Sequence, residues 1–330
     1  MRERSFEVRL CAHLEASGDL VARQLGAGVA RPGNRVVDVL RVDPGQGFEA
    51  RRRLTDAAIP ELAIAADVGA GRARPAAEAV RALEVHPRRA RAALDRAVDV
   101  GFLEAERRGG RTFVRQVARY PDWFAGLTAI ENKPDLDAPG DLDRQLRTDV
   151  ALAVVDRVVL ATASHVTRAH LHRWPDEVGV WRFHPGTGDL EVVREPARLA
   201  VDGPGIELLA RRPGRDVVRL VDAESKARAR RRLAERAYGK GWRPGPPVGC
   251  GHADVVDVAG VGLPACDRYS RLVEPARDCG PDCPAFVPGD APAYDPRELR
   301  DRHSPWVADP DGLFRRQASL ERYAERPRRG

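Results

Sequence analysis

Glu131 and Lys133 are the residues whose types and spacing most suggest chemistry. They stand two positions apart at the end of the apolar run Leu127-Thr128-Ala129-Ile130. Successive side chains of an extended strand point to opposite faces, so these two would project from the same face. A carboxylate can bind a divalent metal ion, and an ammonium beside it can stabilise a developing negative charge.

The choice of lysine at this position is informative. Three of the 55 basic residues are lysines, namely Lys133, Lys226 and Lys240, and the others are arginines. Arginine is a wide planar fork, whereas lysine is a compact point charge. Since arginine supplies plain positive charge elsewhere in this chain, Lys133 indicates a place where a compact ammonium is required.

Asp38 is an acidic residue inside another apolar segment. The β-branched run from 35 to 42 ends before Pro44-Gly45 and predicts a strand. Taken alone, Asp38 is most simply a strand carboxylate that is solvated or paired with arginine. Together with Glu131, it forms a pair of carboxylates on two strands, which suits Mg²⁺. Such a metal ion lowers the pKa of bound water and holds phosphate oxygens during in-line attack.

A second Glu-x-Lys sequence, Glu224-Ser225-Lys226, competes with the first. It follows Asp222 and precedes a run rich in alanine and arginine, which predicts an ordinary helix start with Asp222 as the N-cap. Residues two apart on a helix point in different directions, so this pair does not form a site.

The order of elements predicts an α/β fold with a mixed sheet flanked by helices. We expect a helix from residue 5 to about 18, strands at 20–25, 35–42 and up to 133, and a helix with apolar positions from 142 to 154. A strand at 157–162 then completes a crossover unit that joins parallel strands. A hairpin is expected over 178–193.

This order, with Asp38 on one strand and Glu131-Asn132-Lys133 on the next, resembles the PD-(D/E)XK nuclease superfamily, whose core is restriction-endonuclease-like and similar to archaeal Holliday-junction resolvases. The resemblance covers residues 5–50 and 123–165. Val37 stands where the family often has proline, and the distance from Asp38 to Glu131 is unusually long. The chain also resembles an uncharacterised archaeal domain family, which implies no activity by itself.

The nuclease resemblance implies roles for several residues. Asp38 and Glu131 would bind Mg²⁺ or Mn²⁺, and Lys133 would position or stabilise the attacking water. Glu7, or alternatively Glu15, would add an acid from the first helix, and Gln145 would line the site from the following helix. The nuclease-like core would comprise residues 1–49 and 119–200.

The segment between the two parts of this core predicts an inserted winged-helix-like lobe over 50–118. A helix opening at His86-Pro87 is followed by a basic hairpin with a Gly109-Gly110 turn. Six arginines on the helix start and the hairpin tip would contact DNA: Arg88, Arg89, Arg91, Arg107, Arg108 and Arg111. A winged helix also serves protein contacts, and that alternative stays open.

The C-terminal part predicts a basic helical segment over 201–245 and a Cys-rich, metal-binding lobe and tail over 246–330. Cys250, Cys266, Cys279 and Cys283 are flanked by glycine or proline, which indicates turns. Four thiolates suit Zn²⁺ or an iron–sulfur cluster, with His252 as a substitute ligand, whereas loop cysteines without a metal are the alternative. Cys11 is expected to be a buried helix residue.

Composition limits the class of protein. The chain has 330 residues, a net charge of +6 and 43% hydrophobic residues, enough to bury a core and to favour a phosphate-rich partner. No apolar run is long enough to cross a membrane, and the N-terminus has no signal-like apolar region. We therefore expect a cytoplasmic protein that binds nucleic acid, most simply DNA, and that can form oligomers.

The expected function is DNA hydrolysis. The alternatives are a non-catalytic DNA-binding or regulatory protein on a decayed nuclease core, and a protein-interaction scaffold.

Overall fold

The computed structural model describes residues 3–29, 31–69, 71–137, 140–304 and 306. Its centre is a six-stranded mixed sheet in the order β1-β2-β6-β7-β8-β9. These strands are β1 (Leu20–Gly26), β2 (Val36–Pro44), β6 (Phe124–Asn132), β7 (Arg157–Thr162), β8 (Gly179–His184) and β9 (Asp189–Arg194). The β6–β7 and β7–β8 pairs are parallel, and the other pairs are antiparallel. The predicted mixed α/β fold is confirmed.

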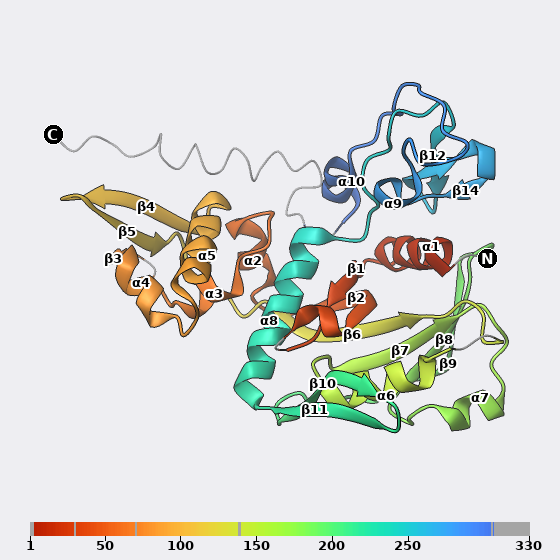
Figure 1. Ribbon diagram of the computed structural model, residues 1–330, viewed down its shortest axis with the longest axis horizontal. Helices are drawn as coiled ribbons and strands as arrows, with labels where there is room; N and C mark the ends of the chain where they lie inside the picture. The colour runs from red at the N-terminus through yellow and green to blue at the C-terminus, as the bar shows by residue number, and fades with distance from the viewer. Residues whose placement is uncertain (1–2, 30, 70, 138–139, 305, 307–330) are drawn as a thin grey trace.

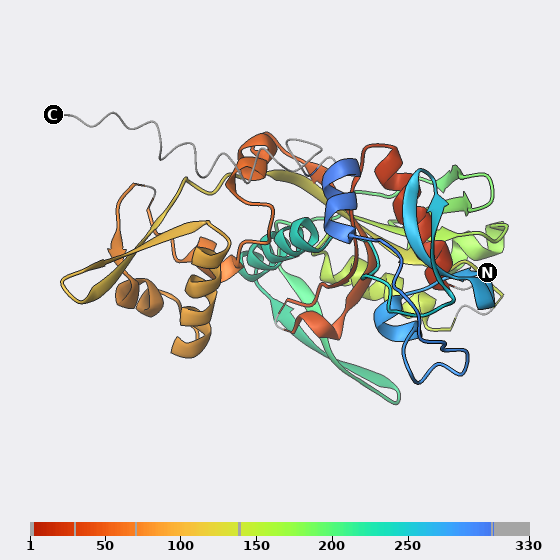
Figure 2. The same cartoon turned by 90° about the horizontal axis from the view of Figure 1, so that it is seen from above.

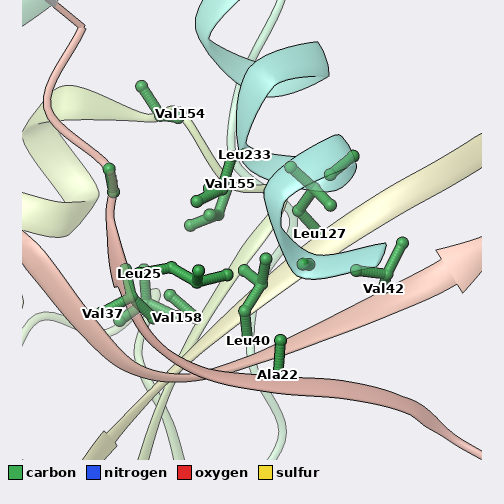
Figure 3. Close-up of a cluster of buried hydrophobic side chains, with 14 of the residues drawn as sticks. Ala22, Leu25, Val37, Leu40, Val42, Leu127, Val154, Val155, Val158 and Leu233 are labelled. Carbon is green, nitrogen blue, oxygen red and sulfur yellow. The ribbon is translucent and has the colours of Figure 1, made fainter. Parts of the chain in front are cut away.

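Helices cover both faces of this sheet (Figure 1). One face packs against α1 (Glu3–Ala16), where Phe6 and Leu10 meet Val39 and Ile130. The other face packs against α6 (Leu142–Leu152) and α8 (Ala223–Lys240). Figure 3 shows Leu233 of α8 among side chains of β1, β2, β6 and β7. The central strands β6 and β7 are therefore buried on both faces, as their apolar sequences require.

The β6–α6–β7 crossover places the end of β6 beside the end of β7. Its helix follows the apolar spacing of Leu142 and Leu146, which are both buried. A short helix, α7 (Arg168–Arg173), precedes β8 and is capped by Thr167, which accepts a hydrogen bond from the backbone N–H of His170. The one-turn helix η1 (Pro32–Asn34) connects β1 to β2.

The inserted segment has a core of its own. It contains α3 (Glu61–Ala65), β3 (Arg74–Pro75), α4 (Ala76–Ala82), α5 (Pro87–Asp99), β4 (Leu103–Arg108) and β5 (Arg111–Gln116), with sheet order β3-β5-β4. Gly109 and Gly110 both have positive φ, the backbone conformation that a two-residue hairpin turn needs. The expected boundary at residue 50 falls inside α2 (Phe48–Leu54), where Phe48 and Arg51 pack against the main core.

The segment expected to be a basic helix, 201–245, is helical from Ala223 onward. Before it lies a two-stranded sheet of β10 (Gly205–Arg212) and β11 (Arg215–Val221). The sequence pattern did not reveal this hairpin because neither strand alternates cleanly between apolar and polar residues, and most of β11 is exposed. Figure 2 shows the hairpin projecting away from the rest of the molecule.

The C-terminal region lies on the α1 side of the sheet (Figure 1). It consists of β12 (Ala253–Val258), β13 (Val261–Cys266), η2 (Asp267–Tyr269), β14 (Arg271–Leu272), α9 (Pro275–Asp278) and α10 (Pro296–His303). Val258, Val261 and Leu263 of the β12–β13 hairpin pack in the same cluster as α1. Among the described residues, no helix combines the length and apolar character needed to cross a membrane.

Candidate functional site

The candidate site lies where β2 and β6 part. The β2–β6 ladder ends at the pair Val39 and Ile130, whereas β6 stays paired with β7 as far as Asn132. Asp38 and Glu131 are the residues immediately beyond the last β2–β6 pair. The backbone N–H of Asn132 donates to Asp38 Oδ2 at 3.0 Å. A carboxylate thus occupies the gap where the strands separate.

Gln24 links Glu7 of α1 to Asp38, the carboxylate in the gap between β2 and β6. It faces Asp38 across the β1–β2 pair, between the partners Arg23–Val39 and Leu25–Val37. Its Nε2 donates to Glu7 Oε2 at 2.8 Å and lies 3.3 Å from Asp38 Oδ1. Its backbone has a φ of +54°, which is unusual for a residue other than glycine inside a strand. Lys240 Nζ donates to the Gln24 carbonyl at 2.7 Å and helps to hold this conformation.

Arg23 anchors Glu7 from the other side. Its Nη1 donates to Glu7 Oε1 at 3.1 Å, and its Nε donates to the Trp242 carbonyl at 2.6 Å. The remaining Nη2 forms an ion pair with Glu274, which immediately precedes α9. Glu7 is therefore tied both to the sheet and to the C-terminal region.

Glu131 is paired with Arg35. Arg35 Nη2 lies 2.6 Å from Glu131 Oε2. The same guanidinium binds Asp149 of α6 through two contacts, Nε to Oδ1 and Nη2 to Oδ2, each of 2.6 Å. Arg35 is therefore bound to Asp149 through two contacts and to Glu131 through one, and a two-contact pair is the stronger attachment.

Burial and mutual repulsion make these acids easier to protonate. Burial raises the pKa of Asp38 to about 6, while the Asn132 N–H lowers it and the Glu7 carboxylate raises it further. Burial also raises the pKa of Glu131 to about 7, and the Asp38 carboxylate is the next largest influence. The pKa of Glu7 is raised as well, again mainly by burial. An added cation beside Asp38 and Glu131 would relieve the repulsion between them.

The other two predicted residues of the nuclease motif, Lys133 and Gln145, lie on the elements next to this cluster. Lys133 continues the strand by one residue, since its N–H donates to the Ala161 carbonyl at 2.9 Å, and it is partly buried. Gln145 lies on α6, one turn before Asp149, and is also partly buried. Asp149 is the α6 residue that contacts the site, and its position four residues after Gln145 was the signal that could have identified it.

Glu15, the alternative to Glu7, lies elsewhere. It is eight residues further along α1, which is about 12 Å along a helix axis. Arg243 binds both of its carboxylate oxygens, at 3.1 and 2.6 Å. Glu15 therefore forms a buried ion pair with the C-terminal region and does not belong to the acid cluster.

The second Glu-x-Lys sequence forms a helix start, as predicted. Asp222 is the N-cap of α8, and its Oδ1 accepts from the Ser225 N–H at 2.7 Å. Lys226 is fully buried, and its Nζ lies 3.4 Å from the Ala200 carbonyl. Glu224 is exposed and pairs with Arg228. Lys226 therefore packs inside the fold while Glu224 faces solvent, so the two residues point apart.

The six arginines expected to contact DNA are all exposed. Arg88, Arg89 and Arg91 lie in the first turns of α5, which His86 caps by accepting from the Arg88 N–H. The others, Arg107, Arg108 and Arg111, surround the β4–β5 turn. Arg108 forms an ion pair with Glu106 and lies over the Phe113 ring, 5.6 Å from its centre. Its charge is therefore partly neutralised.

The four late cysteines line one cavity together with His252. All five cysteines are free thiols, and Cys11 is fully buried in α1, as predicted. Within the described part of the chain, no group of three or more His, Cys, Asp or Glu side chains is already arranged to hold a metal ion. This finding applies both to the acid cluster and to the cysteines.

Comparison with known proteins gives one match. A family model described as "Family of unknown function (DUF5787)" matches residues 20–288. The matched range contains Gln24, Asp38, Glu131 and the four late cysteines, and it begins after Glu7. No curated protein and no solved structure matches the chain.

Proposed function

Because this chain belongs to the DUF5787 family, whose function is unknown, its role has to be argued from the site, and we propose that it is a metal-dependent nuclease-like protein that hydrolyses DNA phosphodiester bonds. One observation carries the proposal: Glu7 of α1 and Asp38 of β2 share the side-chain amide of Gln24, Asp38 and Glu131 flank the point where β2 and β6 part, and the pKa of each acid is raised. Shifted pKa values of this kind cluster at functional sites.

The donor set fits a hard divalent cation. Carboxylate oxygens are the ligands that Mg²⁺ and Mn²⁺ prefer, and Asp38 and Glu131 would hold the ion, with Glu7 beside them. When bound, such an ion supplies a water of lowered pKa and neutralises phosphate charge. Arg35 must first release Glu131, and its two contacts with Asp149 keep the guanidinium paired after that movement.

The surrounding residues have separate tasks in this proposal. Gln24 fixes the Asp38 and Glu7 carboxylates relative to one another. Lys133, two residues after Glu131 on the same strand, would stabilise the attacking water or the phosphate charge. The net charge of +6 and the exposed arginines of α5 and of the β4–β5 turn supply attraction for the DNA backbone. We also propose a cytoplasmic location, in which free thiols such as these five persist.

A specific observation favours a second function, non-catalytic DNA binding. The Arg35–Glu131 ion pair already neutralises one of the two expected metal ligands. If Arg35 holds Glu131 permanently, the acid cluster is a structural element of a decayed nuclease core. The two functions therefore differ in whether Glu131 becomes available to a metal ion.

Cleavage assays separate these functions. We expect single- or double-stranded DNA to be cut with Mg²⁺ or Mn²⁺ and to remain intact in excess EDTA. Glu131→Gln, Asp38→Asn and Lys133→Ala should each lower the rate by at least about 100-fold, as loss of one transition-state contact does. Lys133→Arg should also be severely impaired, because the wider fork cannot replace a point donor.

The matched control is Glu224→Gln in the second Glu-x-Lys sequence, which should leave cleavage unchanged. Circular dichroism should show that each variant is folded. Cleavage that persists in EDTA, or that survives Glu131→Gln, would refute the mechanism. Tight DNA binding without cleavage by either metal would support the non-catalytic function.

A further inference from the structure

Four cysteines from separate parts of the C-terminal region surround one small cavity. Cys250 precedes β12, Cys266 ends β13, Cys279 follows α9, and Cys283 lies in the next turn. The cavity that they line has a volume of about 20 Å³. Each of these thiols is free and partly buried.

The backbone brings the four thiols together through specific pairings. Ala253 is opposite Cys266 in the β12–β13 ladder, and its N–H donates to the Cys250 carbonyl at 2.9 Å. A bridge between Cys250 and Pro288 draws the segment after Cys283 back to the same place. These pairings bring all four thiols to the wall of the same cavity.

Hydrophobic burial does not explain why the stretch that carries Cys279 and Cys283 is folded. Within the described stretch from 276 to 295, no residue is buried. Val258 and Leu263 of the β12–β13 hairpin pack in the cluster that contains α1. A stretch of twenty residues without buried side chains cannot offset its loss of conformational entropy by apolar contacts. Another source of stabilisation is required.

We propose that Cys250, Cys266, Cys279 and Cys283 bind one Zn²⁺ ion as four thiolate ligands. Four sulfur ligands from turns around a single point are the donor set of structural zinc, and the binding energy becomes folding energy. A cavity of about 20 Å³ is close to the space of one small occupant, whereas an iron–sulfur cluster adds several inorganic atoms between the sulfurs.

Binding requires the loops to tighten. In the described residues the cysteines are not yet spaced as a coordinating group, so the sulfurs must move inward to reach the zinc–sulfur distance of about 2.3 Å. The loops that carry Cys279 and Cys283 can make this movement because no buried packing opposes it. His252 lines the same cavity but is not one of the four ligands in this proposal.

The test is metal analysis of the full chain, purified anaerobically without chelators. We expect about one zinc per chain, with little iron or sulfide. Cys266→Ser and Cys283→Ser should each weaken zinc binding by at least about 100-fold, more than loss of a supporting contact outside the ligand set does. Cys11→Ala is the matched control, because Cys11 is buried in α1, and it should keep the full zinc content.

A second measurement covers variants that fail to fold. The zinc of the wild-type protein is exchanged for Co²⁺, whose visible absorption reports tetrahedral sulfur coordination. Cys283→His retains a ligand at this position and should still bind Co²⁺, with weaker sulfur-to-metal absorption. A protein without metal whose four thiols all react freely would overturn the proposal, as would a brown sample that contains iron and sulfide. Zinc retained by Cys266→Ser and Cys283→Ser at wild-type affinity would also overturn it.

Discussion

At the scale of residues, the candidate site concentrates like charges and unusual backbone geometry. Asp38 and Glu131 repel one another, and Gln24 adopts a positive φ inside β1. A left-handed conformation in a residue other than glycine costs about 1–3 kcal/mol. Its side chain contacts Glu7 and Asp38, and its carbonyl accepts from Lys240. The fold therefore maintains this geometry against its local preference, which is common where function requires it.

The raised pKa values of Asp38 and Glu131 predict a pH-dependent stability of the metal-free protein. The folded-state values are about 6 and about 7, against ordinary values of 3.8 and 4.5. Between the ordinary and the raised values, the folded state binds more protons than the unfolded state. These two acids therefore make the free energy of unfolding fall as the pH rises from about 4 to about 7.

Asp38→Asn isolates this effect because asparagine cannot ionise but can still accept from the Asn132 N–H. We expect the variant to gain on the order of 2 kcal/mol relative to the wild type between pH 4.5 and 7.5. Urea denaturation in EDTA at a series of pH values measures it. Parallel curves for the two proteins would show that Asp38 titrates normally. Added Mg²⁺ should shrink the difference above pH 7 if the ion binds ionised Asp38.

At the scale of elements, α5 and the β4–β5 hairpin present basic residues on one compact lobe. The core of this lobe, which includes Leu94, Phe102 and Val114, fixes the helix against the hairpin. The arginine sets at the start of α5 and at the hairpin turn are exposed, so they can reach a partner without unfolding the lobe. Because Arg108 is paired with Glu106, Arg107 and Arg111 should carry most of the hairpin contribution.

Neutralising these arginines should weaken DNA binding and reduce its salt dependence. Replacing Arg88, Arg89 and Arg91 together with alanine should lower the slope of log affinity against log salt by about 2–3, since each phosphate contact contributes about 0.9. Fluorescence anisotropy with a labelled duplex at several salt concentrations measures the slope. The same analysis of Arg107→Ala with Arg111→Ala tests the hairpin.

The control replaces Arg297 and Arg302 of α10, which are also exposed but lie outside the inserted lobe. It should leave the slope near the wild-type value. A slope that is equal in the α5 variant, the hairpin variant and the control would assign the inserted lobe to protein contacts.

At the scale of the whole molecule, one buried acid joins the inserted lobe to the main core. Glu235 of α8 pairs with Arg51 of α2, which is fully buried. Glu235 also accepts from the Ile59 N–H, where the chain enters the lobe, and from Tyr120 and Trp123, where it returns. Figure 1 shows α8 standing between the lobe and the sheet. Glu235 therefore fixes both connections of the lobe.

We expect Glu235→Ala to lower the free energy of unfolding by about 3–5 kcal/mol, because it leaves Arg51 as an unpaired buried charge. Glu224→Ala in the exposed first turn of the same helix should lower it by less than about 1 kcal/mol. Guanidinium denaturation followed by tryptophan fluorescence measures both. Similar losses in the two variants would contradict the anchoring role of Glu235.

Local patterns in the sequence were sufficient for the order of elements in the main sheet. The strands around Asp38 and Glu131, the α6 crossover, the capped start of α5 and the Gly109-Gly110 turn follow from apolar periodicity and from turn and cap preferences. These signals act within a few residues, so they survive without knowledge of the partners. The same is true of Asp222, whose capping role identified the second Glu-x-Lys sequence as a helix start.

The tertiary structure decided which side chains share the site. Arg35 contacts Glu131 and Asp149, which lie 96 and 114 residues away in the sequence. Arg23 binds Glu7 beside the candidate site, whereas Arg243 binds Glu15 away from it. Such contacts depend on strand register and on how helices far apart in the sequence pack. The local spacing of apolar residues determines neither of these. The four cysteines come together for the same reason. Backbone pairings between residues that are distant in the sequence bring them around one cavity.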